Sequence, residues 1–210
     1  MAQAPLEPLV DDLWGRPSLA YHVQPHFAEG DQEALAAIQH LALSDWPQPL
    51  HVPPPDALHV TAYALVPVRG AFDREAYWDE IRDRATDLVR AETATTAPFA
   101  LRFRGIRVRR DSVIAVAEDP SGLIARLRDA IVERLPPPPG LSPLRYDLVH
   151  CTLARFASST PVPSAFTKEV ESRPVDVLVP VERMRIVRET IYPCLFRDEV
   201  VSAPLAPKRA

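Results

Sequence analysis

The triplet His-x-Thr occurs twice in this sequence, each time inside a short apolar run. The first copy is His59 and Thr61, and the second, 91 residues later, is His150 and Thr152. Random placement of the six histidines and nine threonines would give roughly 0.3 such triplets in a chain of this length. Side chains of a β-strand alternate between its two faces, so each histidine shares a face with its threonine. The pair therefore predicts two strands that each present an imidazole and a hydroxyl to a polar cleft.

Proline is unusually frequent, with 24 prolines against only 6 glycines. The prolines gather at residues 47–55 and 136–143, just ahead of the two His-x-Thr segments. Proline fixes the backbone and stiffens a loop, so each motif is introduced by a stiff, extended connection. The two proline-rich loops at equivalent positions indicate a duplicated architecture, although the sequence identity between the two halves is low.

The composition is that of an ordinary soluble globular protein, with 47% apolar and 25% charged residues. A net charge of −4 gives no reason to expect broad binding to long nucleic acids. The chain has no basic start followed by an apolar core and no run of roughly 18 apolar residues, so we expect no membrane segment and a cytoplasmic location. The two cysteines, Cys151 and Cys194, form no disulfide framework or metal pattern and are expected to be small buried residues.

Hydrophobic periodicity predicts a mixed α+β fold with largely antiparallel strands. Residues 1–17 and 204–210 are expected to be irregular tails. We expect Asp31, Asp73 and Ser121 to cap helices. Gly105 is expected to mark a β-bulge. The predicted helices span residues 31–43, 73–92, 121–135 and 164–171, and the predicted strands span 19–24, 58–65, 99–109, 113–117, 146–156, 176–188 and 191–200.

The two motifs, their spacing and the Leu-Ala-Arg that follows Thr152 resemble the two-histidine phosphoesterase superfamily. That superfamily contains the bacterial 2′-5′ RNA ligase-like proteins and the cyclic nucleotide phosphodiesterases. The resemblance covers roughly residues 18–203 and includes a final hairpin that carries Tyr192. It implies a single bilobal domain over residues 1–210, with two pseudo-symmetric lobes of largely antiparallel sheet, helices outside, and one His-x-Thr segment from each lobe in a central cleft.

Two imidazoles on opposite sides of a phosphate suit the cleavage of a cyclic or 2′-linked phosphodiester. An imidazole titrates near neutral pH, so one ring can act as a base while the other acts as an acid. Thr61 and Thr152 can donate hydrogen bonds to the non-bridging phosphate oxygens. No His-Glu-x-x-His and no cluster of carboxylates accompanies the motifs, so we expect neither a metal nor another cofactor. The sequence leaves open which of His59 and His150 is the base.

Four further residues are candidates for substrate binding: Arg155, Tyr192, Tyr63 and Arg104. In a regular strand Arg155 would face away from Thr152. It would lie at the rim of the cleft if the strand twists, or else form an ion pair on the outer face of the strand. Arg104 continues a basic strand face that either binds phosphates or is simply solvated. The tyrosines would either stack on bases or belong to the core. His22 can line the cleft, although a surface or structural role is the simpler interpretation.

We therefore expect a phosphodiesterase acting on RNA ends or small nucleotides, working as a monomer. The main alternative is a non-catalytic RNA- or nucleotide-binding module on the same fold, and a second is a structural protein with two coincidental motifs. The sequence lacks the glycine-rich phosphate loops and the Gly-x-Ser-x-Gly elbow. These absences exclude nucleotide binding by those loops and one common form of serine hydrolysis.

Overall fold

The chain folds into two antiparallel sheets with helices on their outer sides. A computed structural model describes residues 4–144 and 146–207. Its strands are β1 (Pro17–Pro25), β2 (Leu50–His51), β3 (Tyr63–Val66), β4 (Phe99–Val108), β5 (Ser112–Glu118), β6 (Val149–Phe156), β7 (Val177–Val181), β8 (Arg183–Ile191) and β9 (Phe196–Pro204). Its helices are α1 (Glu29–Leu43), the 3₁₀ turn η1 (Pro55–Ala57), α2 (Arg74–Ala94), α3 (Leu123–Arg134) and α4 (Ser164–Ser172).

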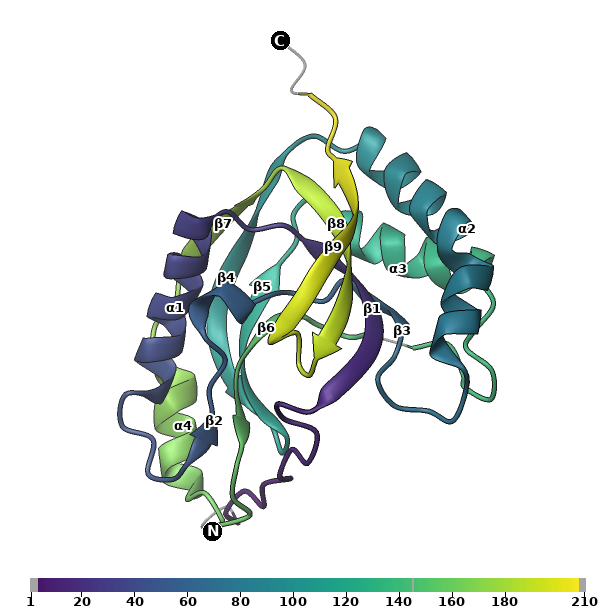
Figure 1. The fold of residues 1–210 in the computed structure, drawn as a ribbon. Helices are drawn as coiled ribbons and strands as arrows, with labels where there is room; N and C mark the ends of the chain where they lie inside the picture. The colour runs from purple at the N-terminus through teal and green to yellow at the C-terminus, as the bar shows by residue number, and fades with distance from the viewer. Residues whose placement is uncertain (1–3, 145, 208–210) are drawn as a thin grey trace.

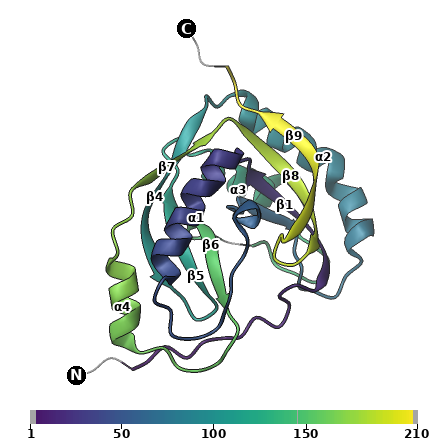
Figure 2. The ribbon, with the colours of Figure 1, turned by 60° about the vertical axis from the view of Figure 1, so that its left-hand side comes forward.

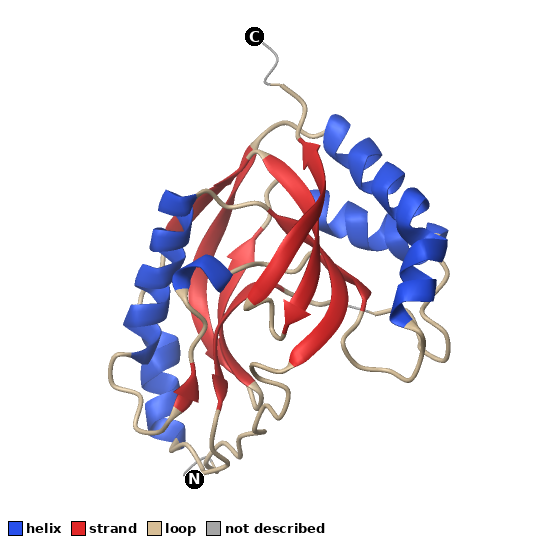
Figure 3. Ribbon diagram, viewed as in Figure 1, coloured by secondary structure: helices blue, strands red, loops and turns tan. Residues whose placement is uncertain are grey.

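One sheet has the strand order β3-β1-β8-β9 and the other β2-β6-β5-β4-β7. Helices α1 and α4 pack on the five-stranded sheet, α2 packs on the four-stranded sheet, and α3 packs against α2. The sheets therefore lie in the middle of the molecule with helices on both outer sides (Figures 1 and 3). The predicted α+β class and two-lobe arrangement are confirmed. Within the described residues, no helix is both long and apolar enough to span a membrane.

Strand β1 separates an apolar face from a polar one. Tyr21 and Val23 are buried on the side of α2, where the Tyr21 ring stacks on Trp78 with centroids 4.0 Å apart. His22 and Gln24 alternate with them and face the other way, as the two-residue period of a strand requires. This second face of β1 therefore carries polar side chains.

The helix starts differ in part from the prediction. Asp73 caps α2 as expected, and its Oδ1 accepts the Ala76 N–H at 3.0 Å. Asp31 is not an N-cap: α1 starts two residues earlier, and the Asp31 carboxylate instead accepts the N–H of Ala28 at 3.1 Å. Helix α3 starts two residues after Ser121 because Gly122 has φ +66°, which is incompatible with a right-handed helix.

The first His-x-Thr motif does not lie in a regular strand, which corrects the prediction for residues 58–65. It lies in the extended segment between η1 and β3, with Val60 in a single antiparallel bridge to Cys151. Two residues later, the N–H of Ala62 donates to the carbonyl of Val23 in the other sheet at 2.8 Å. The segment passes from one sheet to the other and so cannot extend a ladder along either.

The C-terminal strands were also predicted incorrectly. Residues 176–188 form two strands rather than one, because the chain crosses between the sheets at the exposed Glu182. Strand β7 pairs with β4 in the five-stranded sheet, whereas β8 pairs with β1 in the other. The predicted bulge is confirmed, since the register of β4 against β5 shifts between Phe103 and Gly105.

Candidate active site

The single bridge between Val60 and Cys151 sets the geometry of the candidate site. Because the bridge is antiparallel, it opposes the histidine of each motif to the threonine of the other. Directly opposed side chains have Cβ atoms roughly 5 Å apart, and diagonal neighbours, here the two histidines, are roughly 7–8 Å apart. Val60 and Cys151 are fully buried, whereas the four motif residues are only partly buried. The four therefore share the open face.

Arg128 of α3 ties the two motif segments together. Its guanidinium donates to the carbonyl of Ala62 at 2.9 Å and to that of Leu148 at 2.8 Å. The same guanidinium lies 4.9 Å above the ring of Tyr146, whose hydroxyl accepts the N–H of Ala64 at 3.0 Å. One residue thus holds the chain just after the first motif and just before the second. Sequence reasoning missed it, because nothing distinguishes Arg128 from the other arginines of α3.

Replacing Arg128 by methionine is expected to lower kcat by roughly ten- to a hundredfold with little change in KM, the cost typical of a small misplacement of catalytic groups. Arg126→Met is the matched control, because Arg126 lies on the same helix and donates to Thr96 instead. Steady-state kinetics on both variants test this. Equal kcat values for the two variants would contradict a positioning role for Arg128.

His59 has a defined tautomer. Its Nδ1 lies 2.8 Å from the carbonyl of Ala57, and a carbonyl can only accept, so Nδ1 carries the proton. Nε2 then keeps its lone pair in the neutral ring. Burial lowers the pKa of His59 to about 3, against 6.5 for an unperturbed imidazole, with a smaller opposing effect from the Ala57 hydrogen bond. In the substrate-free protein His59 is therefore a neutral imidazole with a free Nε2.

His150 lies in cationic surroundings. Burial lowers its pKa, and the charges of Arg109, Arg128 and Arg155 lower it further, whereas Asp111 raises it. The same three arginines create a positive potential beside the ring, which attracts an anionic ligand. A bound phosphate would supply the negative charge that favours protonation of His150.

A cleft of about 750 Å³ opens beside the motifs. Its wall includes His22, Ala64, Asp111, Arg155 and Tyr192. The four motif residues are not part of this wall. They are nevertheless close to it along the chain, because Ala64 lies three residues after Thr61 and Arg155 lies three residues after Thr152. A ligand in the cleft can therefore extend toward both imidazoles.

Arg155 reaches the cleft because strand β6 contains a bulge. Ile114 of β5 opposes Thr152 and Val113 opposes Ala154, so Leu153 is an extra residue in β6. An extra residue resets the alternation of side chains. Arg155 therefore returns to the face of Thr152 rather than facing away, which settles the alternatives left open by the sequence.

The other three predicted substrate-binding residues divide between the cleft and elsewhere. Tyr192, in the turn between β8 and β9, lines the cleft, and the guanidinium of Arg155 lies 5.3 Å from its ring centroid. Tyr63 does not line it; its ring is buried and packs edge-on against Tyr146 at 5.4 Å. Arg104 does not line it either, since it is exposed and pairs with Glu118 at 3.5 Å beside a separate hollow.

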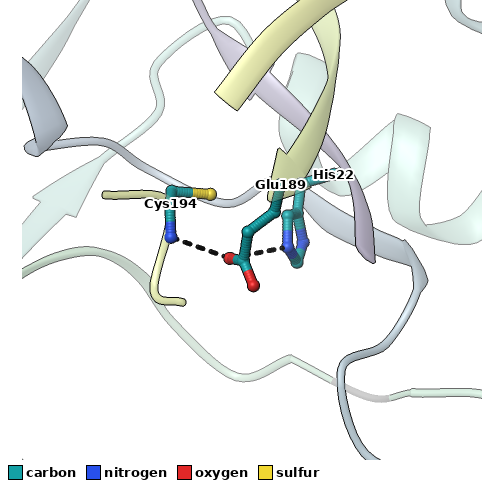
Figure 4. Close-up of side chains that lie close together, drawn as sticks. All are labelled: His22, Glu189 and Cys194. Atoms are coloured by element: carbon teal, nitrogen blue, oxygen red, sulfur yellow. Dashed lines mark hydrogen bonds and ion pairs between the residues drawn. The ribbon is translucent and has the colours of Figure 1, made fainter. Parts of the chain in front are cut away.

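The Glu189 carboxylate lies beside His22 in the cleft wall (Figure 4). The Nε2 of His22 lies 3.4 Å from the Glu189 carboxylate, which also accepts the Ser18 hydroxyl and the Cys194 N–H, both at 2.8 Å. Within the described parts of the chain, one group of three residues of the types that commonly bind metals has its ligand atoms within 4.8 Å of one another: His22, Glu189 and Cys194. Burial raises the pKa of the Cys194 thiol, and the N–H of Cys194 rather than its sulfur contacts the Glu189 carboxylate.

A comparison with models of protein families identifies the family of this chain. The family model described as the 2′-5′ RNA ligase superfamily matches residues 30–190. The chain belongs to this superfamily. The resemblance to the two-histidine phosphoesterases is thereby confirmed, and with it the phosphoesterase character of the family.

Several solved structures share the fold over most of the chain. TT0787 of Thermus thermophilus superimposes with a TM-score of 0.65 and 21% identity, covering 90% of this chain and 100% of its own. A conserved protein of unknown function, ATU0111 of Agrobacterium tumefaciens, gives 0.62 and 18%, covering 95% and 93%. E. coli LigT complexed with 3′-AMP gives 0.54 and 14%, covering 90% and 99%. No curated protein matches the sequence.

Proposed function

We propose that this member of the 2′-5′ RNA ligase superfamily is a metal-independent phosphodiesterase. Its proposed substrates are 2′,3′-cyclic phosphates or 2′-5′ linkages at RNA ends or in small nucleotides. The observation that supports this most is the bridge between Val60 and Cys151, which opposes the two His-x-Thr motifs on one open face. A cleft of about 750 Å³ beside them is of the size that holds one nucleotide-sized ligand. E. coli LigT has been solved with 3′-AMP and with phosphate, which supports the ligand class.

In the proposed mechanism His59 is the base for hydrolysis. Its free Nε2 takes a proton from the attacking water, while Nδ1–H stays bonded to the Ala57 carbonyl and fixes the ring. His150, protonated when the anionic phosphate is bound, gives its proton to the leaving ribose oxygen. Thr61 and Thr152 donate to the non-bridging oxygens, where negative charge builds up in the transition state. The two imidazoles exchange roles if the reaction runs in reverse.

Hydrolysis of adenosine 2′,3′-cyclic phosphate in the presence of EDTA tests the proposal. Turnover that is lost in His59→Ala and in His150→Ala supports the paired-histidine enzyme. Saturable binding without turnover would show that the protein is a nucleotide-binding module rather than an enzyme. If the protein neither binds nor hydrolyses this compound, its role is structural. Turnover that stops on chelation and returns with a divalent metal would overturn the metal-independent mechanism.

The pH dependence of the rate should differ between kcat/KM and kcat. Because the pKa values of both His59 and His150 are lowered in the free protein, the bell-shaped curve of kcat/KM should have its maximum below about pH 6.5. An anionic phosphate between the rings raises both pKa values, so the maximum of kcat should lie at higher pH. Rate profiles between roughly pH 4 and 9 measure both maxima. Coincident maxima, or a rate that rises throughout this range, would contradict the assignment.

A further inference from the structure

The N-terminal strap, residues 4–16, packs along the open side of the molecule. Leu6 and Val162 exchange two backbone hydrogen bonds of 2.9 Å, and the N–H of Asp11 donates to the carbonyl of Phe156 at 3.1 Å. Near the end of the strap, the N–H of Gly15 donates to the carbonyl of Tyr192 at 2.9 Å. Figure 2 shows this segment running along the bottom of the view from the N-terminus to β1. The strap is therefore fixed at both β6 and the β8–β9 turn, on either side of the cleft.

Asp11 of the strap directs a carboxylate at the cleft arginine. Its Oδ2 lies 3.2 Å from the Nε of Arg155, and the two side chains are only 5% and 20% exposed. Both atoms are shielded from solvent, and neither makes a hydrogen bond of good geometry to another described residue. The contact is therefore a close, poorly solvated charge pair whose directional hydrogen-bonding capacity is unused. Asp11, Arg155 and Tyr192 all line the same cleft.

The next residue of the strap, Asp12, forms a similar ion pair, but at a solvent-exposed position. Asp12 Oδ1 lies 3.1 Å from Arg69 Nη2, but these side chains are 69% and 67% exposed. Solvent screens such a pair, so it has little effect on a ligand, whereas a shielded pair is screened much less. Asp12 and Arg69 also line the cleft, so Asp12 is a control for shielding from solvent rather than for position: it is the same side chain, one position along the same strap, paired with the same kind of cation.

We propose that Asp11 is a specificity-determining residue that makes the cleft favour a singly charged phosphodiester over a doubly charged phosphomonoester. The inference rests on the proposed function and deepens it. A phosphodiester carries one negative charge, whereas the monoester formed by hydrolysis gains a second with a pKa near 6. An unopposed guanidinium binds a phosphate dianion strongly through two parallel hydrogen bonds. Asp11 cancels the charge of Arg155, so the guanidinium holds the second negative charge of the monoester less strongly, and substrate is accepted and product is released.

Asp11→Asn tests this inference, because asparagine keeps the size of the side chain and removes its charge. The probes are adenosine 3′-phosphate and adenosine 2′,3′-cyclic phosphate, with dissociation constants measured by calorimetry on the full chain carrying His150→Ala, so that the cyclic diester is not hydrolysed during the measurement. The variant should bind the monoester about tenfold tighter, with a smaller change for the cyclic diester, the scale expected for one nearby charge. The gain should grow between roughly pH 5 and 7.5, as the second phosphate proton is lost. Asp12→Asn should change the ratio of the two constants less than twofold.

A double-mutant cycle with Arg155→Met separates the effect of charge from that of packing. If Asp11 acts through Arg155, Asp11→Asn should not alter the ratio in the Arg155→Met background. An unchanged ratio in Asp11→Asn itself, an equal change for both ligands, or wild-type protein that binds neither ligand would overturn the inference. Binding needs no turnover, so the two proposals can fail separately. Hydrolysis with an unchanged ratio refutes the role of Asp11 alone, and discrimination without hydrolysis refutes the enzyme alone.

Discussion

Replacing either His59 or His150 by alanine is expected to lower kcat/KM for a 2′,3′-cyclic phosphate by roughly 10²–10⁴-fold, the usual contribution of one general acid or base. The loss should appear mainly in kcat, since each imidazole acts on a proton that moves in the transition state. His40→Ala is the matched control, because His40 is exposed on α1 and lies outside the proposed mechanism. Its kinetics should match those of the wild type.

The two losses should differ once the leaving group is changed. A nitrophenolate leaves without being protonated, so a nitrophenyl phosphodiester does not need the acid but still needs the base. If His150 is the acid, His150→Ala should recover most of the wild-type rate on this substrate, whereas His59→Ala should remain slow. The fixed tautomer of His59, with Nδ1–H bonded to Ala57 and Nε2 free, is the reason for this assignment.

Two results would contradict parts of this mechanism. Recovery in His59→Ala instead of His150→Ala would reverse the assignment of acid and base. Equal, small losses in both variants on both substrates would show that neither imidazole transfers a proton. The second result would favour binding without acid/base catalysis on the same fold.

The alternation of the two motifs could be read from the sequence because it depends only on local geometry. Apolar residues on one side and a His-Thr pair on the other describe an extended segment wherever it lies in the fold. The structure has this pattern, with Val60 and Cys151 buried between partly exposed motif residues. The mixed fold class could be predicted for the same reason, since the periodicity of each element is local.

The partners across the chain could not be predicted, because they depend on register. The bulge at Leu153 moves the side chain of Arg155 to the face of β6 that borders the cleft. No local pattern in the sequence of β6 indicates this extra residue. The sequence indicates Tyr63 as either a base-stacking or a core residue, and Arg104 as part of a basic strand face that either binds phosphates or is solvated. Tyr63 is directed into the core against Tyr146, and Arg104 lies on the outside with Glu118.

The N-terminal strap and His22 show the same limit. Residues 1–17 look like a tail because their prolines and acidic residues lack periodicity, yet Asp11 reaches Arg155 through a fold that brings β6 beside the strap. His22 looks like a surface residue in the sequence, but it lies 3.4 Å from the Glu189 carboxylate, which the turn after β8 brings to the N–H of Cys194. Contacts of this kind exist only once distant elements have packed together.

The low pKa of His59 has a second large consequence, which concerns stability. In the unfolded chain an imidazole titrates at 6.5, and in the folded protein that of His59 titrates at about 3. Between these values the unfolded state binds more protons, so the free energy of unfolding must fall as pH falls through this window. Each tenfold difference in proton affinity corresponds to about 1.4 kcal/mol, so the loss due to His59 alone should be roughly 2–3 kcal/mol at pH 4.5. The lowered pKa of His150 acts in the same direction.

His59→Asn removes this titration while keeping a donor for the Ala57 carbonyl. Denaturant unfolding of wild type and variant at pH 7 and at about pH 4.5 should show that the variant loses less stability on acidification, by roughly 2 kcal/mol or more. His40→Asn, at an exposed position, should lose as much as the wild type. If His59→Asn loses as much as well, His59 is not held neutral by its surroundings. A hydrated His59 would titrate near 6.5 like an ordinary imidazole, and the low pKa assigned to it in the substrate-free protein would be wrong.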